Sequence, residues 1–438
     1  MTDAAPIRAT FRDVFAVREF RALWFSEILS VAGDRLALVA LTLLVYDRTR
    51  SPLLAALAYA AGYLPWVIGG LFLADLADRR PRRSVMITCD VARAVLVAVM
   101  TLPGMPLAAL VALLFAATMF TPLDAAARSA ITPDILPGER YALGVAVGQT
   151  TFYSAQVAGA VDGGVAVVFI GARFSLALDA ATFVFSALLV GLGIRARPAA
   201  ARPESGQQSP LGRMRAGFRL VFTDRALRII TLLAWMCVFY TIPEGVAAPY
   251  AARLGAGPVG TGLVLASAVA ATAVFMPLFT RFARPRQRDS LMGPLAVLTC
   301  GTLVLTIFRP GLVASLAIFS ASAAFGVYQL AANTAFVLRV PNERRSQAFG
   351  IASMGVVVGQ GMTFLAAGAA AEVITPAAVI AIGGGIGAVV AFILTLRWYR
   401  VSPPGGRHAA RRLRRAAARI PVPPHRQGAV AGARAARS

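Results

Sequence analysis

Leu76-Ala77-Asp78-Arg79-Arg80-Pro81-Arg82-Arg83 is the stretch that decides the fold of this chain. One carboxylate and four guanidiniums fall within these eight residues. On both sides the sequence is apolar for about the length that crosses a bilayer. Because arginine is costly to place in hydrocarbon, the stretch must lie at a membrane face, and the positive-inside rule makes that face the cytoplasm. A topological anchor needs only positive charge, so the acid among the arginines calls for a further explanation.

The composition of the chain is that of a polytopic membrane protein. Of 438 residues, 58% are hydrophobic and 14% are charged, whereas soluble proteins are about 45–50% apolar and about 25% charged. The net charge is +23. The basic residues lie mainly between apolar runs and in the tails, which indicates membrane topology and contact with anionic lipid headgroups rather than nucleic-acid binding.

Residue types that are absent or scattered exclude several kinds of site. The chain has no lysine, so neither the P-loop of an ATP-driven pump nor a Schiff base has its amine. Cys89, Cys237 and Cys300 lie far apart in apolar runs, and both histidines are in the C-terminal tail. We therefore expect no enzyme, no cofactor, no disulfide framework and no metal site.

About twelve apolar runs are each long enough for a tilted transmembrane helix. Only helices satisfy their backbone polar groups in lipid at that length, so we predict an all-α protein with twelve transmembrane helices. Arginine-rich and charge-poor loops alternate, which places both termini in the cytoplasm. The predicted spans are Ala22–Tyr46, Leu53–Leu73, Ser84–Leu102, Leu107–Pro122, Ala142–Val165, Phe174–Ile194, Leu227–Tyr250, Thr261–Phe282, Leu291–Phe308, Leu312–Val337, Phe349–Ala371 and Pro376–Trp398.

Two short matches at one spacing indicate that the chain is duplicated. Arg80-Pro81-Arg82 recurs as Arg284-Pro285-Arg286, and Pro137-Gly138-Glu139-Arg140 recurs as Pro341-Asn342-Glu343-Arg344, each 204 residues later (284 − 80 and 341 − 137). The composition of the 195–226 segment suits a linker, and Met214–Arg225 could lie along the membrane surface as a helix. The predicted parts are a cytoplasmic N-terminal arm (1–21), a six-helix half (22–194), a cytoplasmic central loop (195–226), a second six-helix half (227–398) and a disordered basic tail (399–438).

The loop quoted above resembles the signature of the major facilitator superfamily, roughly Gly-x-Leu-Ala-Asp-Arg-x-Gly-Arg-Lys/Arg. Ala74 and Pro81 replace its two glycines, and the other defined positions match. Gly33-Asp34-Arg35-Leu36, Leu178-Asp179-Ala180 and Tyr328-Gln329 resemble the bacterial drug, macrolide and siderophore (enterobactin-exporter-like) efflux branch of that superfamily. The resemblance implies two pseudo-symmetric six-helix halves and alternating access.

The resemblance also implies a cytoplasmic gate at the loop. In this superfamily the loop aspartate faces the positive N-terminus of a neighbouring helix, which here would start near Ser346. Asp90 and Arg93 are three residues apart and belong either to this gate or to a local ion pair. The predicted gate residues are Asp78, Arg79, Arg82, Arg83, Asp90 and Arg93.

Ionisable residues inside the apolar runs are candidates for the transport site, because burying them is costly. Asp34 lies about 18 Å along its span at 1.5 Å per residue, and Glu244 follows Pro243, which should kink the seventh helix. The candidate proton or substrate site contains Asp34, Glu244, Asp162, Asp179, Glu27 and Arg35. Tyr63, Trp66, Gln149, Tyr328, Gln329, Asn333 and Gln360 are candidates for lining a cavity.

One motif departs from the expected pattern. Antiporters of the superfamily usually read like Gly-Pro-x-x-Gly-Gly in the fifth helix, whereas this chain reads Gly159-Ala160-Val161-Asp162-Gly163-Gly164. The absent proline and the added acid weaken the antiporter interpretation. The glycine spacing still predicts a close approach between helix backbones.

The sequence as a whole predicts a proton-coupled exporter of small hydrophobic or amphipathic molecules. Asp34 is the first candidate for the proton carrier and Glu244 the second, because the spans contain no histidine or lysine. An uptake symporter, a lipid flippase and a non-transporting membrane sensor are the alternatives. The expected partners are a small-molecule substrate, protons and membrane lipids, and the expected setting is the plasma membrane of a bacterium, as a monomer.

Overall fold

The described residues of this computed structural model are 10–66, 80–197, 210–341 and 344–401, and within them the fold is entirely helical. The tail beyond residue 401 and the first nine residues lie outside that range. The first part contains α1 (Phe11–Phe15), α2 (Arg18–Thr49), α3 (Pro52–Ala60), α6 (Arg82–Met100), α7 (Leu107–Thr118), α8 (Thr121–Ile135), α9 (Glu139–Phe169) and α10 (Gly171–Gly193). The second part contains α11 (Pro210–Thr223), α12 (Arg225–Trp235), α13 (Cys237–Tyr240), α14 (Ile242–Gly245), α15 (Ala247–Arg253), α16 (Gly257–Phe282), α17 (Pro285–Thr302), the 3₁₀ helix η1 (Leu303–Phe308), α18 (Leu312–Phe325), α19 (Tyr328–Arg339), α20 (Arg345–Val373) and α21 (Pro376–Val401).

Ten helical segments in the described ranges are long and apolar enough to cross a membrane. They correspond to ten of the twelve predicted spans. The second predicted span, Leu53–Leu73, is described only as far as Trp66, and the third corresponds to α6, which carries four charged residues. The all-α polytopic fold is therefore confirmed, and the count of twelve stays a prediction.

The helices form two halves that repeat the same order. In the first half α2 packs against α9 and α10, and α6 packs against α7, α8 and α10; in the second, α17 packs against α18, α19 and α21. Equivalent helices begin at a nearly constant interval: α7 at Leu107 and α18 at Leu312 (312 − 107 = 205), and α3 at Pro52 and α16 at Gly257 (257 − 52 = 205). This interval extends the 204-residue repeat of the sequence to whole helices.

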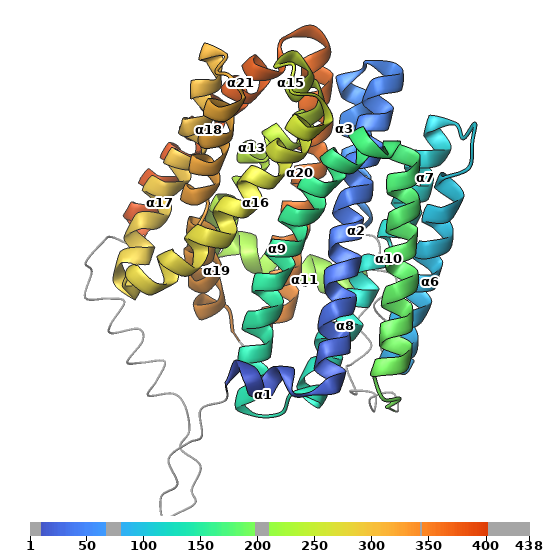
Figure 1. The fold of residues 1–438 in the computed structure, drawn as a ribbon. Coiled ribbons are helices and arrows are strands. Elements are labelled where there is room, and N and C mark those ends of the chain that lie inside the picture. The colour runs from blue at the N-terminus through green and yellow to red at the C-terminus, as the bar shows by residue number, and fades with distance from the viewer. Residues whose placement is uncertain (1–9, 67–79, 198–209, 342–343, 402–438) are drawn as a thin grey trace, which may run out of the picture.

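The helices of the bundle run between two ends (Figure 1). We call the end at which α6, α9 and α20 begin the arginine end, since Arg82, Arg140 and Arg345 lie there. At the opposite, far end, α3 and α16 begin and α20 ends. Figure 1 shows α1 at the arginine end and α15 at the far end.

The two halves pack closely in the far part of the molecule. A Cβ atom built on Gly164 of α9 would lie 2.6 Å from the carbonyl oxygen of Pro258, and one built on Gly262 of α16 would lie 2.5 Å from that of Ala160. Such backbone contact requires glycine on both helices, which the glycine motif of the fifth span predicts.

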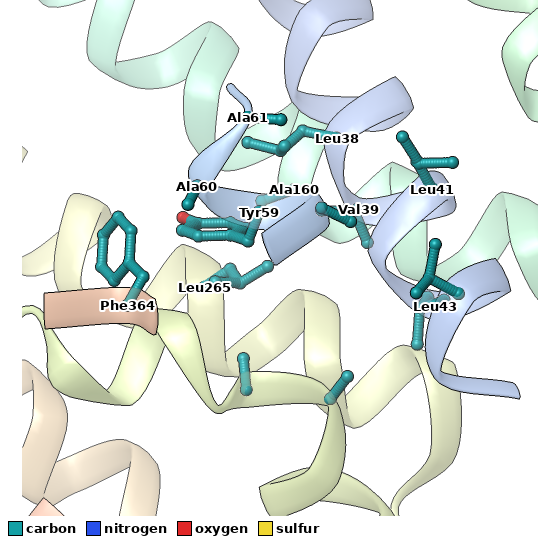
Figure 2. Close-up of a cluster of buried hydrophobic side chains, with 14 of the residues drawn as sticks. Leu38, Val39, Leu41, Leu43, Tyr59, Ala60, Ala61, Ala160, Leu265 and Phe364 are labelled. Atoms are coloured by element: carbon teal, nitrogen blue, oxygen red, sulfur yellow. The ribbon is translucent and has the colours of Figure 1, made fainter. Parts of the chain in front are cut away.

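Two further contacts join the halves on the other side of the bundle, between α3 and α20. Glu372 accepts hydrogen bonds from the Ser51 hydroxyl and, at 3.0 Å, from the Leu53 backbone N–H. Tyr59 packs on Phe364 with ring centroids 5.1 Å apart, inside an apolar cluster to which both halves contribute (Figure 2). These contacts close the far end of the bundle.

The fourth predicted span, Leu107–Pro122, is too short. The structure continues it through α7 and α8 to Ile135, giving a single segment from Leu107 to Ile135. The sequence places Asp124, Arg128 and Asp134 beyond the hydrocarbon, but Asp124 and Arg128 are buried and paired at 3.2 Å inside the first half. Neutralising both charges within the protein lets the helix continue where hydropathy predicts a loop.

The segment between the halves also contains a helix. α11 runs from Pro210 to Thr223, overlapping the predicted surface helix Met214–Arg225, and α12 begins after Asp224, whose carboxylate accepts from two backbone N–H groups as an N-cap. Gly217 of α11 packs against the backbone of Gln347 in α20. The position of α11 relative to a membrane surface stays a prediction.

Candidate functional site

The seventh span is broken into four short helices that present Glu244 to the interface between the halves. Proline cannot donate to the helix ladder, and the breaks fall at Met236, Thr241 and Val246, around Pro243 and Gly245. The kink predicted at Pro243 is thus confirmed. Glu244 lies on α14, where it contacts side chains of the other half.

Glu244 is the centre of a polar cluster that joins the two halves. Its Oε2 atom accepts hydrogen bonds from the hydroxyls of Tyr59 at 3.0 Å and Tyr63 at 3.2 Å. Arg35 of α2 donates to the Tyr63 hydroxyl at 3.0 Å, so this hydroxyl lies between a guanidinium and a carboxylate. The cluster therefore holds opposite charges, Arg35 from the first half and Glu244 from the second, with two tyrosine hydroxyls between them.

The cluster lines a cavity of about 200 Å³ together with Gln156 and Gln360. A second cavity of about 410 Å³ shares Gln360 and extends along the second half. Its lining includes Phe336 near the end of α19 and Phe349 near the start of α20, and both positions are close to the arginine end. The space therefore runs from the cluster toward the arginine end, while the far end is closed.

The larger cavity has an amphipathic lining. Its polar groups are neutral: among the described residues that line it, none carries a full charge. Gln329 donates to the Ala234 carbonyl at 2.7 Å and contacts the Tyr240 hydroxyl at 3.4 Å, so its side chain is held in place. The hydrogen-bonding side chains of this lining are Tyr153, Thr231, Tyr240, Thr272, Gln329, Asn333, Ser353 and Gln360, interspersed with Met276, Phe336, Phe349 and valines.

Asp34, the first candidate from the sequence, has a partly exposed side chain (38%) on α2 in the first half, whereas its partner Arg93 is buried (1%). Its carboxylate forms an ion pair with Arg93 of α6, and Arg93 also donates to Ser30 at 3.1 Å. The Arg93 guanidinium stacks 4.1 Å from the Phe183 ring centroid. Asp34 is not among the residues that line the described cavities, so the structure separates it from Glu244.

The local pair of Asp90 with Arg93 does not form. Arg93 pairs with Asp34 instead, and Asp90 accepts a hydrogen bond from Ser186 of α10 at 2.6 Å. Both side chains are buried, at 0% and 1% exposure, inside the first half rather than at its arginine-end surface. A three-residue spacing allows a pair but cannot reveal a stronger partner on another helix.

The other acidic candidates lie apart from the Glu244 cluster. Asp179 is buried on α10 and accepts from Thr182, and Gly33 packs directly against both side chains. Glu27 faces α9, where Gly148 approaches it, and Asp162 is exposed on α9. A transport role for any of these three stays a prediction.

The cavity-lining candidates divide into two groups. Gln329, Asn333 and Gln360 line the larger cavity, and Tyr63 and Gln360 line the smaller one. Tyr328 is instead fully buried and donates to the Leu233 carbonyl at 2.9 Å. Gln149 and Trp66 are exposed and line neither cavity.

Two of the four predicted loop residues of the gate can be placed. Arg82 forms an ion pair with Asp134 at 2.7 Å and donates to the Ala130 carbonyl at 2.5 Å. Arg83 donates to the Gly191 carbonyl of α10. Both arginines thus hold α6 against its neighbours at the arginine end. Asp78 and Arg79 lie outside the described residues, and their role in a gate stays a prediction.

The candidates drawn from the sequence leave out two residues of the site, Tyr59 and Gln156. Tyr59 precedes Tyr63 by four residues and therefore lies on the same helical face, a signal that could have paired them. Gln156 of α9 lines the small cavity, one turn from Tyr153, which lines the larger one as expected for an aromatic residue of this span. Their predicted span is recognisable, but the face that meets the second half is not visible in the sequence.

The comparison with known families agrees with this architecture. The profile of the Major Facilitator Superfamily matches residues 23–337. The uncharacterized MFS-type transporter YkuC of Bacillus subtilis is 30% identical over 181 residues, which are 41% of this chain and 42% of YkuC. Macrolide efflux protein A of Streptococcus pyogenes is 25% identical over 126 residues, 28% of this chain and 31% of that protein. The chain thus spans less than half the length of these curated relatives.

Solved structures show the same fold at low sequence identity. A POT family transporter in complex with 5-aminolevulinic acid superposes with a TM-score of 0.71 at 12% identity, covering 91% of this chain and 99% of that one. The nucleoside transporter NupG gives 0.71 at 14% identity over 86% of this chain and 99% of its own. A POT family transporter in complex with a thioalcohol-conjugated peptide gives 0.68 at 14% identity over 88% and 96%.

Proposed function

Because this chain belongs to the major facilitator superfamily, we propose that it is a proton-coupled exporter of small amphipathic molecules. As a multi-pass member of that superfamily it is a transmembrane transporter. The proposal adds the direction, the coupling ion and the substrate class. One observation carries it: the only carboxylate that lines the described cavities, that of Glu244, is held by hydroxyls of the opposite half at the closed end of the space.

The cluster supplies a means of coupling protonation to access. Tyr59 and Tyr63 belong to the first half and Glu244 to the second, so the hydrogen bonds between them exist only while the far end is closed. Arg35 bonds Tyr63 within the first half. Burial disfavours the ionised carboxylate, and the two hydroxyl donors and the nearby guanidinium offset that cost, so we expect the proton to leave toward the arginine end only while these donors are in place. When the halves part at the far end, Glu244 loses these donors and takes up a proton from that side. The geometry therefore favours Glu244 over Asp34 as the carrier.

The amphipathic substrate class follows from the larger cavity. An uncharged lining with spaced hydroxyl and amide groups offers hydrogen bonds without fixing a charge, and aromatic and methionine side chains supply apolar surface. Gln360 lines both cavities, so a solute in the larger one lies beside the Glu244 cluster. The likeness to a macrolide efflux protein supports an exported, amphipathic solute.

A drug-sensitivity screen tests direction and substrate together. Cells that lack the protein are expected to be more sensitive to a subset of amphipathic compounds, and to accumulate them, relative to cells that express it. Export would be contradicted if both cell types were equally sensitive to every compound in a broad panel and the cells that lack the protein accumulated less of a polar solute.

Topology can be tested with single cysteines at the two ends. We propose that the arginine end faces the cytoplasm, on the positive-inside rule. Leu102→Cys lies in the far-end turn after α6, and Glu139→Cys lies at the arginine-end start of α9. An impermeant thiol reagent applied to intact cells is expected to label only the first, in a Cys237→Ala background that removes the cavity thiol. Equal labelling of both positions would contradict the proposed orientation.

Uptake of a polar solute is the second candidate function. The smaller cavity carries Arg35 and Glu244, and fixed opposite charges of this kind can bind a zwitterion. Two of the solved structures with this fold are transporters in complex with a peptide conjugate and with 5-aminolevulinic acid. In an uptake symporter the solute and the proton would move in the same direction, which the transport measurement at the end of the Discussion distinguishes.

A further inference from the structure

One face of α20 packs along α3 at the interface between the halves. The two helices run in opposite directions, since α3 begins at the far end and α20 ends there. A Cβ atom built on Gly368 would lie 3.0 Å from both the Leu53 Cα atom and the Pro52 carbonyl oxygen, which belong to the first turn of α3. Glu372 lies one turn further along α20 and therefore on the same face. This packing brings the Glu372 side chain to the start of α3.

Glu372 caps the start of α3 from the other half. Its Oε1 atom accepts hydrogen bonds from the Leu53 backbone N–H at 3.0 Å and from the Ser51 hydroxyl. Ser51 is the N-cap residue of α3, and its hydroxyl oxygen accepts in turn from the Leu54 N–H at 3.2 Å. The first N–H groups of a helix have no partner within the helix, and a carboxylate is favoured at this positive end. An acid of the second half thus completes the start of a helix of the first half.

The start of α3, and not a side-chain cation, holds Glu372 in place. Arg50, which directly precedes Ser51, pairs with Asp47 of its own half at 2.8 Å. Within the described ranges Glu372 forms no ion pair, so its partners there are the Ser51 hydroxyl and the Leu53 N–H. Both partners belong to the first half. The hydrogen bonds are therefore lost when the halves part at the far end.

We propose that Glu372 is a latch of the far end, which stabilises the closed arrangement by capping α3 and releases it when the halves part. The latch controls access to the Glu244 cluster from that end, so the inference deepens the proposed function by adding the regulation of the same site. It rests on the opening and closing of the far end in the proposed transport cycle, and not on the direction of transport, the coupling ion or the substrate.

The latch is the far-end counterpart of the gate that the sequence predicts at the arginine end. There Asp78, which follows the second predicted span, is expected to face the start of α20. At the far end Glu372, near the end of α20, caps the start of α3. Each of the two spans would then carry an acid that caps the other, at opposite ends of the molecule. Asp78 lies outside the described residues, and its part in this arrangement stays a prediction.

Spin labels across the far end test the latch in purified protein in lipid nanodiscs, without any solute. The labels are attached to Leu102→Cys, in the turn after α6, and to Val313→Cys, at the start of α18, in a background whose three native cysteines are replaced by alanine. Both positions are exposed, and they belong to different halves. Pulsed electron paramagnetic resonance measures the distance between the labels. The ratio of its long to its short component reports the ratio of open to closed molecules.

Glu372→Ala is expected to raise the ratio of open to closed molecules about fivefold, the usual effect of losing an N-cap acceptor. Glu372→Gln should raise it less, because the amide oxygen still accepts from Ser51 and Leu53 but carries no charge. The glycine contacts between the halves persist in both variants, so the far end still closes. Asp47→Asn is the matched control, because this exposed acid at the same end bonds Arg50 of its own half, and it should leave the ratio unchanged.

Two results would overturn the latch. One is an unchanged ratio in both Glu372 variants, which would mean that the glycine contacts alone close the far end. The other is an equal rise in Asp47→Asn, which would mean that any loss of negative charge at this end opens it. Glu372→Gln keeps the shape of the side chain, so it decides the question if Glu372→Ala folds poorly. Because no transport is measured, failure here leaves the exporter proposal to its own tests.

Discussion

Glu244→Gln is expected to abolish transport driven by a pH gradient while leaving exchange of solute across the membrane intact. The amide keeps the shape of the side chain and can still accept from Tyr59 and Tyr63, which bond Glu244 at 3.0 and 3.2 Å. It cannot carry a proton, so solute movement is no longer linked to proton movement. The measurement is solute flux in proteoliposomes, first with a pH gradient and then under exchange conditions without one.

Two variants serve as controls for this result. Tyr63→Phe removes the hydroxyl between Arg35 and Glu244 but keeps the titratable carboxyl, so gradient-driven transport should persist at a reduced rate. Asp34→Asn tests the alternative carrier in the first half. Gradient-driven transport that survives Glu244→Gln and is lost in Asp34→Asn would move the coupling site to the Asp34–Arg93 ion pair of the first half.

Gly164→Val is expected to stop the transport cycle without preventing folding or membrane insertion. The closed far end brings Gly164 against the Pro258 backbone, where a Cβ atom would lie only 2.6 Å from the carbonyl oxygen. A backbone atom cannot yield as a flexible side chain can, so the valine must separate α9 from α16. The contact joins the two halves, so the strain falls on the closed arrangement and not on either half alone.

A cross-link at the far end reports this closure directly. Ser51 and Glu372 are hydrogen-bonded across the halves, so Ser51→Cys with Glu372→Cys should be joined readily by a short bifunctional thiol reagent in the wild-type background. In the Gly164→Val background the cross-link should form slowly or not at all. Unchanged cross-linking and unchanged transport would show that the glycine contact is not needed for closure.

Gly159→Val is the matched comparison within the same motif. Gly159 faces the Ala32 backbone of α2, inside the first half. Its replacement should therefore destabilise the fold itself, by about 1–3 kcal/mol or more on the usual scale of overpacking. Lower yield and a lower melting temperature are expected for this variant, in contrast to a stable but inactive Gly164→Val.

The fold was predictable because the bilayer limits the choices. Long apolar runs, alternating arginine loops and a 204-residue repeat lead to an all-α polytopic protein with two halves, and the structure confirms that fold class. The boundary of the fourth span was missed because Asp124 and Arg128 neutralise each other inside the protein. Hydropathy records the cost of a charge in lipid but not the presence of its partner.

The site was only partly predictable for a related reason. Glu244 was recognised as a costly acid beside a proline, and Arg35 as a charge in the first span. Their connection through the Tyr59 and Tyr63 hydroxyls depends on how the two halves meet. The depth of Asp34 along its span can likewise be read from the sequence, but depth alone does not distinguish a residue that lines a cavity from one that pairs with Arg93 of another helix.

Solute flux in proteoliposomes of the wild-type protein, with and without an imposed pH gradient, tests proton-coupled export most directly. The solute is a compound that the sensitivity screen identifies. An inward proton gradient is expected to accelerate solute movement in the opposite direction, and a protonophore is expected to remove the acceleration. Flux that is indifferent to the gradient would contradict proton coupling, and solute moving in the same direction as the protons would contradict export.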